Sequence, residues 1–149
     1  MANLDISRAP REAKIKLHGA EAFKGMRKAG QLAAQALDML VEHVRPGVTT
    51  EFLDERVLDF AIKHGAIPAP LNYRGFPKSI CTSVNHVVCH GIPNNKALKE
   101  GDIVNIDVTL ILDGWHGDTS RMYAVGHISR RAERLIEVTY EALMRGVAA

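Results

Sequence analysis

The chain has 149 residues, of which 46% are hydrophobic and 24% are charged, a balance typical of one soluble domain with a modest core. The 19 basic and 17 acidic side chains leave a formal charge of +2, which does not indicate a specific nucleic-acid binder. No apolar run reaches membrane-spanning length, and residues 1–10 lack the apolar segment of a secretory signal. We therefore expect a cytoplasmic protein that does not enter a membrane.

Residues 1–13 are predicted to form a short, locally basic and solvated arm, ahead of one domain that spans residues 14–149. Cys81 and Cys89 lack zinc-finger spacing. In a reducing compartment we expect both to be free thiols, with Cys89 as a small buried residue in a strand.

Two helices are predicted in the first part of the chain. The first spans residues 21–44 and ends at Pro46 and Gly47. The second begins after an N-cap at Thr49 or Thr50. The apolar positions at helical spacing are Phe23, Met26, Ala29, Leu32, Ala33, Ala36, Leu37, Leu40, Val41 and Val44 in the first, and Leu53, Val57 and Phe60 or Ala61 in the second.

Strands are expected in the second part of the chain. An irregular strand and loop over residues 68–77 precede short strands at 79–84 and 86–90, and a loop follows over 91–102. After the hairpin described next, a final helix is predicted from about residue 130 to 145. Helices followed by antiparallel strands indicate an α+β architecture, with the sheet packed by helices.

The segment after residue 101 contains the strongest local signal in the chain. Asp113 and Gly114 lie between two alternating segments, and Asp-Gly in this position predicts a two-residue hairpin turn. In that register Leu112 pairs with Trp115. One face should then be apolar and buried and the other polar, as in a half-buried strand. The apolar face comprises Val104, Ile106, Val108, Leu110 and Leu112, and the polar face comprises Asn105, Asp107, Thr109, His116, Asp118 and Ser120.

The same register brings two carboxylates together. Asp107 lies opposite Ser120, so Asp118 is its diagonal neighbour, at roughly 7–8 Å. Two carboxylates directed at one spot repel each other unless positive charge lies between them, and a pair of divalent metal ions would supply it. An ordinary solvated hairpin face is the alternative that these residues leave open.

Several blocks of the sequence resemble methionine aminopeptidase of type I, within the pita-bread metallopeptidase family. The resemblance extends from about Lys14 to the last residue, in matching order and spacing. The blocks that carry it are residues 72–79, 81–85, 87–93, 101–107 and 116–120.

The resemblance implies a pita-bread fold and a two-metal hydrolase that removes the initiator methionine from nascent peptides, with manganese, iron, cobalt or zinc as the metal. Asp107 and Asp118 would be metal ligands, with Asp118 bridging both ions, and His90 would be the catalytic residue that contacts the substrate. The methionine pocket is implied at Tyr73, Phe76 and Cys81, and neighbours of the ligands at Asn105 and Thr109. A ribosome contact is a further implication.

The sequence departs from the family pattern in one respect. The family site also needs a histidine and two glutamates from the second half of its domain, and no segment here matches those motifs. Glu133, Glu137 and Glu141 are predicted to form a solvated helix face. We therefore expect residues 14–149 to form the N-terminal half of the catalytic domain. The alternatives are a half-domain that self-associates through the face where the other half would pack, a binding module, and a proline-specific relative.

Overall fold

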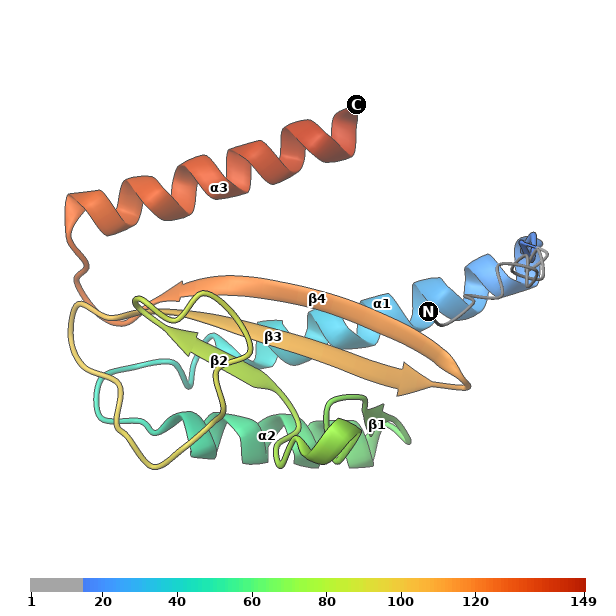
Figure 1. Cartoon of the computed structure of the whole chain (residues 1–149), viewed down its shortest axis with the longest axis horizontal. Helices are drawn as coiled ribbons and strands as arrows, with labels where there is room; N and C mark the ends of the chain where they lie inside the picture. Colours follow the sequence, from blue (N-terminus) through green and yellow to red (C-terminus); the bar gives the residue numbers. More distant parts are fainter. Residues whose placement is uncertain (1–14) are drawn as a thin grey trace, which may run out of the picture.

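A computed structural model describes residues 15–149. The predicted arm at residues 1–13 lies outside the described residues. A four-stranded antiparallel sheet is covered on one face by two helices, whereas a third helix stands away from it on the other side (Figure 1). The elements are α1 (Ala20–Leu40), α2 (Thr50–Lys63), β1 (Ile67–Pro68), a single 3-10 turn η1 (Tyr73–Gly75), β2 (Cys81–Val84), β3 (Ile103–Leu112), β4 (Trp115–Ala124) and α3 (Arg130–Ala148).

The β3–β4 hairpin has the predicted register. Leu112 pairs with Trp115 and Asp107 with Ser120. The two turn residues, Asp113 and Gly114, have φ values of 51° and 80°, the positive values that a type I′ turn requires. β3 is the central strand, because it pairs with β4 on one edge and with β1 and β2 on the other.

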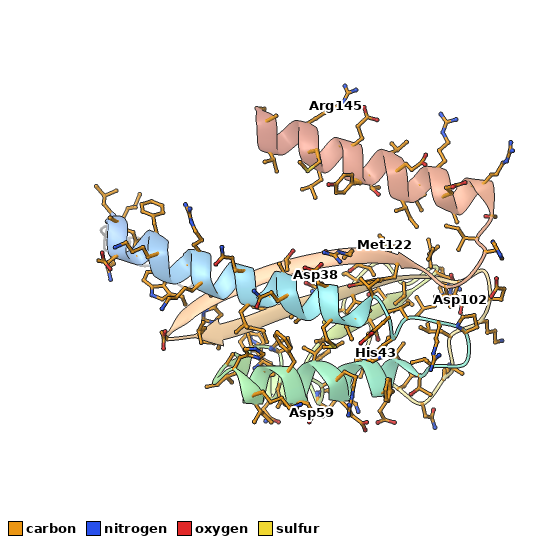
Figure 2. All side chains as sticks on the ribbon, turned by 180° about the vertical axis from the view of Figure 1, so that it is seen from behind. Asp38, His43, Asp59, Asp102, Met122 and Arg145 are labelled. Atoms are coloured by element: carbon orange, nitrogen blue, oxygen red, sulfur yellow. The ribbon has the colours of Figure 1, made fainter. Side chains whose placement is uncertain are left out.

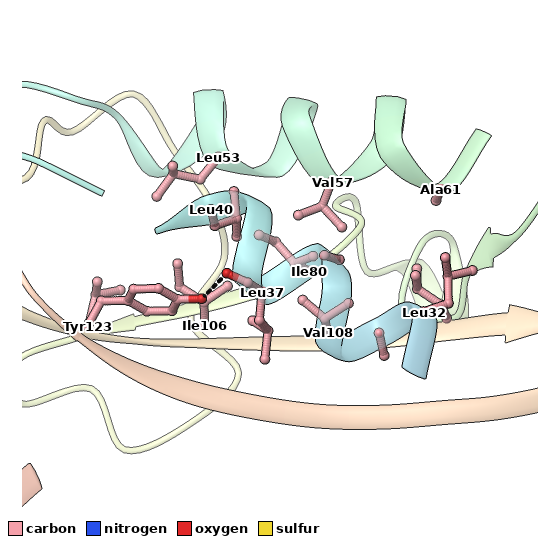
Figure 3. Packing of buried hydrophobic residues seen from close by; sticks show 14 of the residues in the cluster. Leu32, Leu37, Leu40, Leu53, Val57, Ala61, Ile80, Ile106, Val108 and Tyr123 are labelled. Carbon is pink, nitrogen blue, oxygen red and sulfur yellow. Dashed lines mark hydrogen bonds between the residues drawn. The ribbon is translucent and has the colours of Figure 1, made fainter. Parts of the chain in front are cut away.

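The core lies between the sheet and the two helices α1 and α2 (Figure 3). Its largest fully buried side chains come mainly from α1, α2 and β3, and the burial of each removes apolar surface from water. The Tyr123 hydroxyl in β4 donates a 2.6 Å hydrogen bond to the Leu37 carbonyl in α1. Asp38, on the outer side of α1, accepts a hydrogen bond from Arg121 of β4 (Figure 2). These contacts fix α1 against the strand that carries Asp118.

The predicted N-cap and buried stripe of α2 are confirmed, with Thr49 as the N-cap and Ala61 as the last residue of the stripe. The Thr49 side chain accepts a hydrogen bond from the Phe52 amide, and Leu53, Val57 and Ala61 are buried. Helix α1 is shorter than predicted, because it ends at Leu40.

The predicted strand over residues 86–90 is wrong. Asn85 and His90 have positive φ values, 53° and 56°, which no strand accommodates. The Asn85 side chain accepts a hydrogen bond from the Ile103 amide and donates one to Asp102, so it turns the chain away from β2. Cys89 is therefore exposed in a loop instead of buried in a strand.

Helix α3 has an apolar stripe but no buried residue. Met122 lies on the sheet face that is turned toward α3 (Figure 2). No helix among residues 15–149 is long and apolar enough to cross a membrane.

Candidate metal centre and pocket

A pocket of about 800 Å³ opens on the sheet face opposite α1 and α2. Its lining draws on β3, β4, β2, the turn η1 and the loop after β2. Seven of the eight residues that the sequence singled out contribute to it, namely Tyr73, Phe76, Cys81, His90, Asp107, Thr109 and Asp118. Asn105 is not among the lining residues; it pairs with Ser83 and Met122 further along the sheet.

The two aspartates lie close together on this face. Asp118 is directly opposite Thr109, whose hydroxyl donates a 2.9 Å hydrogen bond to Asp118 Oδ1. Burial raises the pKa of Asp107, and the neighbouring Asp118 carboxylate raises it further, while His90 opposes both effects. The hairpin therefore holds two carboxylates in mutual repulsion, an arrangement that a cation would stabilise.

His90 reaches the pocket because its loop docks on β2. The Thr82 amide donates a 2.8 Å hydrogen bond to the Gly91 carbonyl, and the Gly91 amide donates to Ser83 Oγ. A Cβ at Gly91 would lie 2.1 Å from the Thr82 carbonyl oxygen, so this close approach requires glycine.

The apolar end of the pocket is formed by Phe76 and Cys81, with Tyr73 at its exposed rim. Cys81 pairs with Asp107 across β2 and β3. Burial raises the pKa of the Cys81 thiol to about 11, and the nearby Asp107 carboxylate contributes to this increase. The thiol is therefore a neutral part of the pocket wall at physiological pH.

Two lining residues with polar or charged side chains were not assigned a firm role from the sequence. His116 shares the polar face with Asp118, as the register predicted, and it lines the pocket. Arg74 was missed; it lies in the same sequence block as Tyr73, and its guanidinium is 5.4 Å from the centre of the Tyr73 ring. Its position in that block was the available signal.

The donors that are present fit part of a metal site. Carboxylate oxygens suit hard and borderline divalent ions, and Asp107 and Asp118 present them at one place. Within residues 15–149, however, no group of three or more His, Cys, Asp or Glu side chains is arranged so that it could hold a metal ion. Glu133, Glu137 and Glu141 are exposed on α3, as expected for a solvated face.

The pocket thus combines a pair of carboxylates on the sheet with a histidine from the neighbouring loop. The family model for metallopeptidase family M24 matches residues 24–149, and the chain belongs to this family. It is 63% identical over 133 residues to a methionine aminopeptidase of Rickettsia prowazekii (strain Madrid E), across 89% of this chain and 51% of that protein. The resemblance seen in the sequence is thereby confirmed.

Solved structures agree on the fold. The crystal structure of methionine aminopeptidase from Rickettsia prowazekii matches with a TM-score of 0.87 and 64% identity, over 89% of this chain and 53% of that one. The Xaa-Pro dipeptidase from Bacillus anthracis matches with a TM-score of 0.75 and 25% identity, over 87% of this chain and 35% of that one. The fold is the predicted pita-bread fold, and the chain spans about half the length of the methionine aminopeptidase relatives from Rickettsia and Synechocystis.

Proposed function

We propose that this chain supplies the aspartate pair, the histidine and the side-chain pocket of a metal-dependent aminopeptidase that removes N-terminal methionine from nascent peptides in the cytoplasm. The observation that carries the proposal is the convergence of Asp107, Asp118 and His90 on one pocket with an apolar end. The high identity to methionine aminopeptidases favours this substrate over the proline-specific alternative.

Each residue has a role that follows from its place. Asp107 and Asp118 would hold divalent ions, and the Thr109 hydroxyl orients the Asp118 carboxylate through their hydrogen bond. When bound, such ions supply an activated water and polarise the scissile carbonyl. His90 would donate a hydrogen bond to the oxygen that becomes negative during attack. Phe76 and Cys81 would surround the unbranched methionine side chain.

We propose that the remaining ligands and the general base belong to the half of the relatives' length that this chain does not span. The pocket lining within residues 15–149 contains no glutamate. The half-site itself should therefore bind metal more weakly than a complete one, because each missing carboxylate or histidine removes a ligand.

Metal binding is the direct test. Titration calorimetry with Mn²⁺ and with Co²⁺ should give a binding signal for the wild-type chain that is lost in Asp107→Asn, whose fold is checked by circular dichroism. Equal binding by both proteins would refute the assignment of the aspartates. Methionine release from a Met-Ala-Ser peptide, with Asp107→Asn as the control for contaminating enzyme, then tests whether this chain alone completes the reaction.

A second candidate function is self-association or partner binding as a half-domain. The observation that favours it is the exposed apolar stripe of α3, which includes Leu135, Val138, Leu143 and Val147, each more than half exposed. A second copy would cover these side chains in a symmetric dimer. Sedimentation velocity over a wide concentration range tests this idea, and a monomer at every concentration would exclude it. Association that survives replacement of both Asp107 and Asp118 by Asn would show that it is independent of metal.

A further inference from the structure

Asp54 is a buried carboxylate that lies outside the pocket and outside the proposed metal pair. It is in the second turn of α2 and only 5% of its surface is exposed. Its Oδ1 atom accepts two backbone hydrogen bonds, one of 2.7 Å from the Ser79 amide and one of 3.1 Å from the Ile80 amide. Burying a carboxylate costs free energy unless it is hydrogen-bonded. The two backbone hydrogen bonds to Asp54 offset part of that cost.

The segment that Asp54 binds is fixed by a second charged contact. Lys78 Nζ lies 2.7 Å from Glu51 Oε1 and 3.9 Å from Asp54 Oδ2. Ser79 and Ile80 are themselves buried. The first two turns of α2 therefore clamp three consecutive residues immediately before β2.

These three residues join two parts of the pocket wall. Phe76 and Pro77 precede them and Cys81 follows them, and all three of these flanking residues line the pocket. Any movement of the clamped segment is therefore transmitted to the apolar end of the pocket on both sides.

The rest of the pocket loop depends on such an anchor. At its start, the Ala69 amide donates a 2.9 Å hydrogen bond to the Thr109 carbonyl of β3. Between the two anchors, Asn72 and Arg74 adopt positive φ values of 66° and 49°, which cost free energy in residues other than glycine. A strained loop keeps one shape only when its ends are held, and Asp54 holds the end next to Phe76.

We propose that Asp54 is a positioning residue that fixes the wall formed by Phe76 and Cys81, and so gives the pocket its fit for an unbranched apolar side chain. The occupant named here rests on the proposed function. Asp54 acts through the Ser79 and Ile80 amides and makes no contact with the substrate.

The test uses the 149-residue chain with Cys89→Ser, which leaves Cys81 as its one thiol. Cys81 is 8% exposed, so its rate of modification by a neutral maleimide at fixed pH reports how well the wall is closed. The probe ligand is methioninol, an amine with an unbranched thioether side chain. The variants are Asp54→Ala and Asp54→Asn, whose amide oxygen still accepts both backbone hydrogen bonds. The matched control is Asp38→Ala, because Asp38 also joins a helix to the remainder of the fold, through Arg121.

Asp54→Ala should accelerate modification of Cys81 by about tenfold or more and remove protection by methioninol, because local opening becomes easier. Hydrogen exchange at the Ser79 and Ile80 amides should accelerate with it. Asp54→Asn should stay within about threefold of the parent rate, and Asp38→Ala should do the same even if its global stability falls.

Two results would overturn the proposal. One is an equal acceleration of Cys81 modification in Asp54→Ala and Asp38→Ala at matched global stability. That result would mean that Asp54 stabilises the whole fold and has no specific effect on the pocket wall. The other is an Asp54→Asn variant that is as open as Asp54→Ala. If Asp54→Ala does not fold, Asp54→Leu replaces it, because leucine is similar in size and accepts no hydrogen bond from the Ser79 and Ile80 amides, and an unchanged Cys81 rate in that variant also overturns the proposal. Acceleration in Asp54→Ala without methioninol protection in the parent would uphold the positioning role and refute methionine as the occupant.

Discussion

Gly117 lies where β4 crosses closest to α1, and replacing it with alanine should separate the two elements. The residue is buried, pairs with Leu110 and immediately precedes Asp118. A Cβ at this position would lie 2.1 Å from the Ala29 carbonyl oxygen and 2.5 Å from the Gly30 amide nitrogen. Both neighbours are helix backbone atoms, so neither can move aside as a flexible side chain would.

The size of the effect follows from that geometry. Since ordinary Cβ contacts begin beyond 3.0 Å, α1 or β4 must shift by about 1 Å to admit the methyl group. Such overpacking costs about 1–3 kcal/mol, and a rigid backbone neighbour places the cost near the upper end. For a chain of this length each kcal/mol lowers the melting temperature by about 2–4 °C. We therefore expect a decrease of about 6–12 °C, accompanied by weaker metal binding because Asp118 moves with β4.

Thermal and guanidinium unfolding followed by circular dichroism measures this change, and Gly30→Ala is its internal control. Gly30 is in α1, and a Cβ there would meet no atom within 4 Å. That substitution should stabilise the chain by about 0.5–1 kcal/mol, because alanine has the better helix propensity. A Gly117→Ala protein that unfolds within about 0.5 kcal/mol of wild type would refute the close-packing argument.

Three further predictions concern hydrogen bonding and ionisation. Tyr123→Phe should lower the free energy of unfolding in urea by about 1–3 kcal/mol, because the buried Leu37 carbonyl loses its donor. Burial raises the pKa of Tyr123 to about 12, so the fold favours the neutral phenol. The free energy of unfolding of the wild type should therefore stay constant below pH 10 and fall as the pH rises toward 12. Tyr123→Phe should lack this fall. Asp107→Asn should raise the melting temperature in EDTA, because the raised pKa of Asp107 means that its ionised form opposes folding at neutral pH. The variant should also lose any increase in melting temperature that Mn²⁺ gives the wild type.

The hairpin could be predicted in detail because its determinants are local. A period of two and an Asp-Gly turn together fix which residues face each other, since a slip of one residue would move every buried side chain to the solvent face. The approach of Asp107 to Asp118 followed directly from that register. The approach of His90 did not, because it depends on a loop that docks on β2 through Thr82 and Ser83.

Two departures from the local sequence pattern share a physical cause, because tertiary contacts decide both of them. Phe23 and Met26 are at helical spacing, yet both are exposed, because every buried residue of α1 lies between Ala29 and Leu40, where the helix packs on the sheet. Periodicity marks an apolar stripe and does not reveal how much of it finds a partner. Val87 and Val88 are β-branched, but the hydrogen bonds that Asn85 makes with Asp102 and Ile103, 17 and 18 residues away, override local propensity.

The site combines two parts whose supports are different. The carboxylates sit on a hairpin whose ladder and contacts with α1 set their separation, and the apolar wall sits on a loop that α2 holds through Asp54. The two supports meet where Cys81 pairs with Asp107 and where the Ala69 amide donates to the Thr109 carbonyl. They are otherwise held by different elements, and residues with few shared partners contribute nearly independently. A change at Asp54 should then alter which side chain the pocket accepts while the carboxylates keep their geometry, and a change at Gly117 should do the reverse. Substrate fit and metal binding should then vary largely independently, apart from coupling through these two contacts.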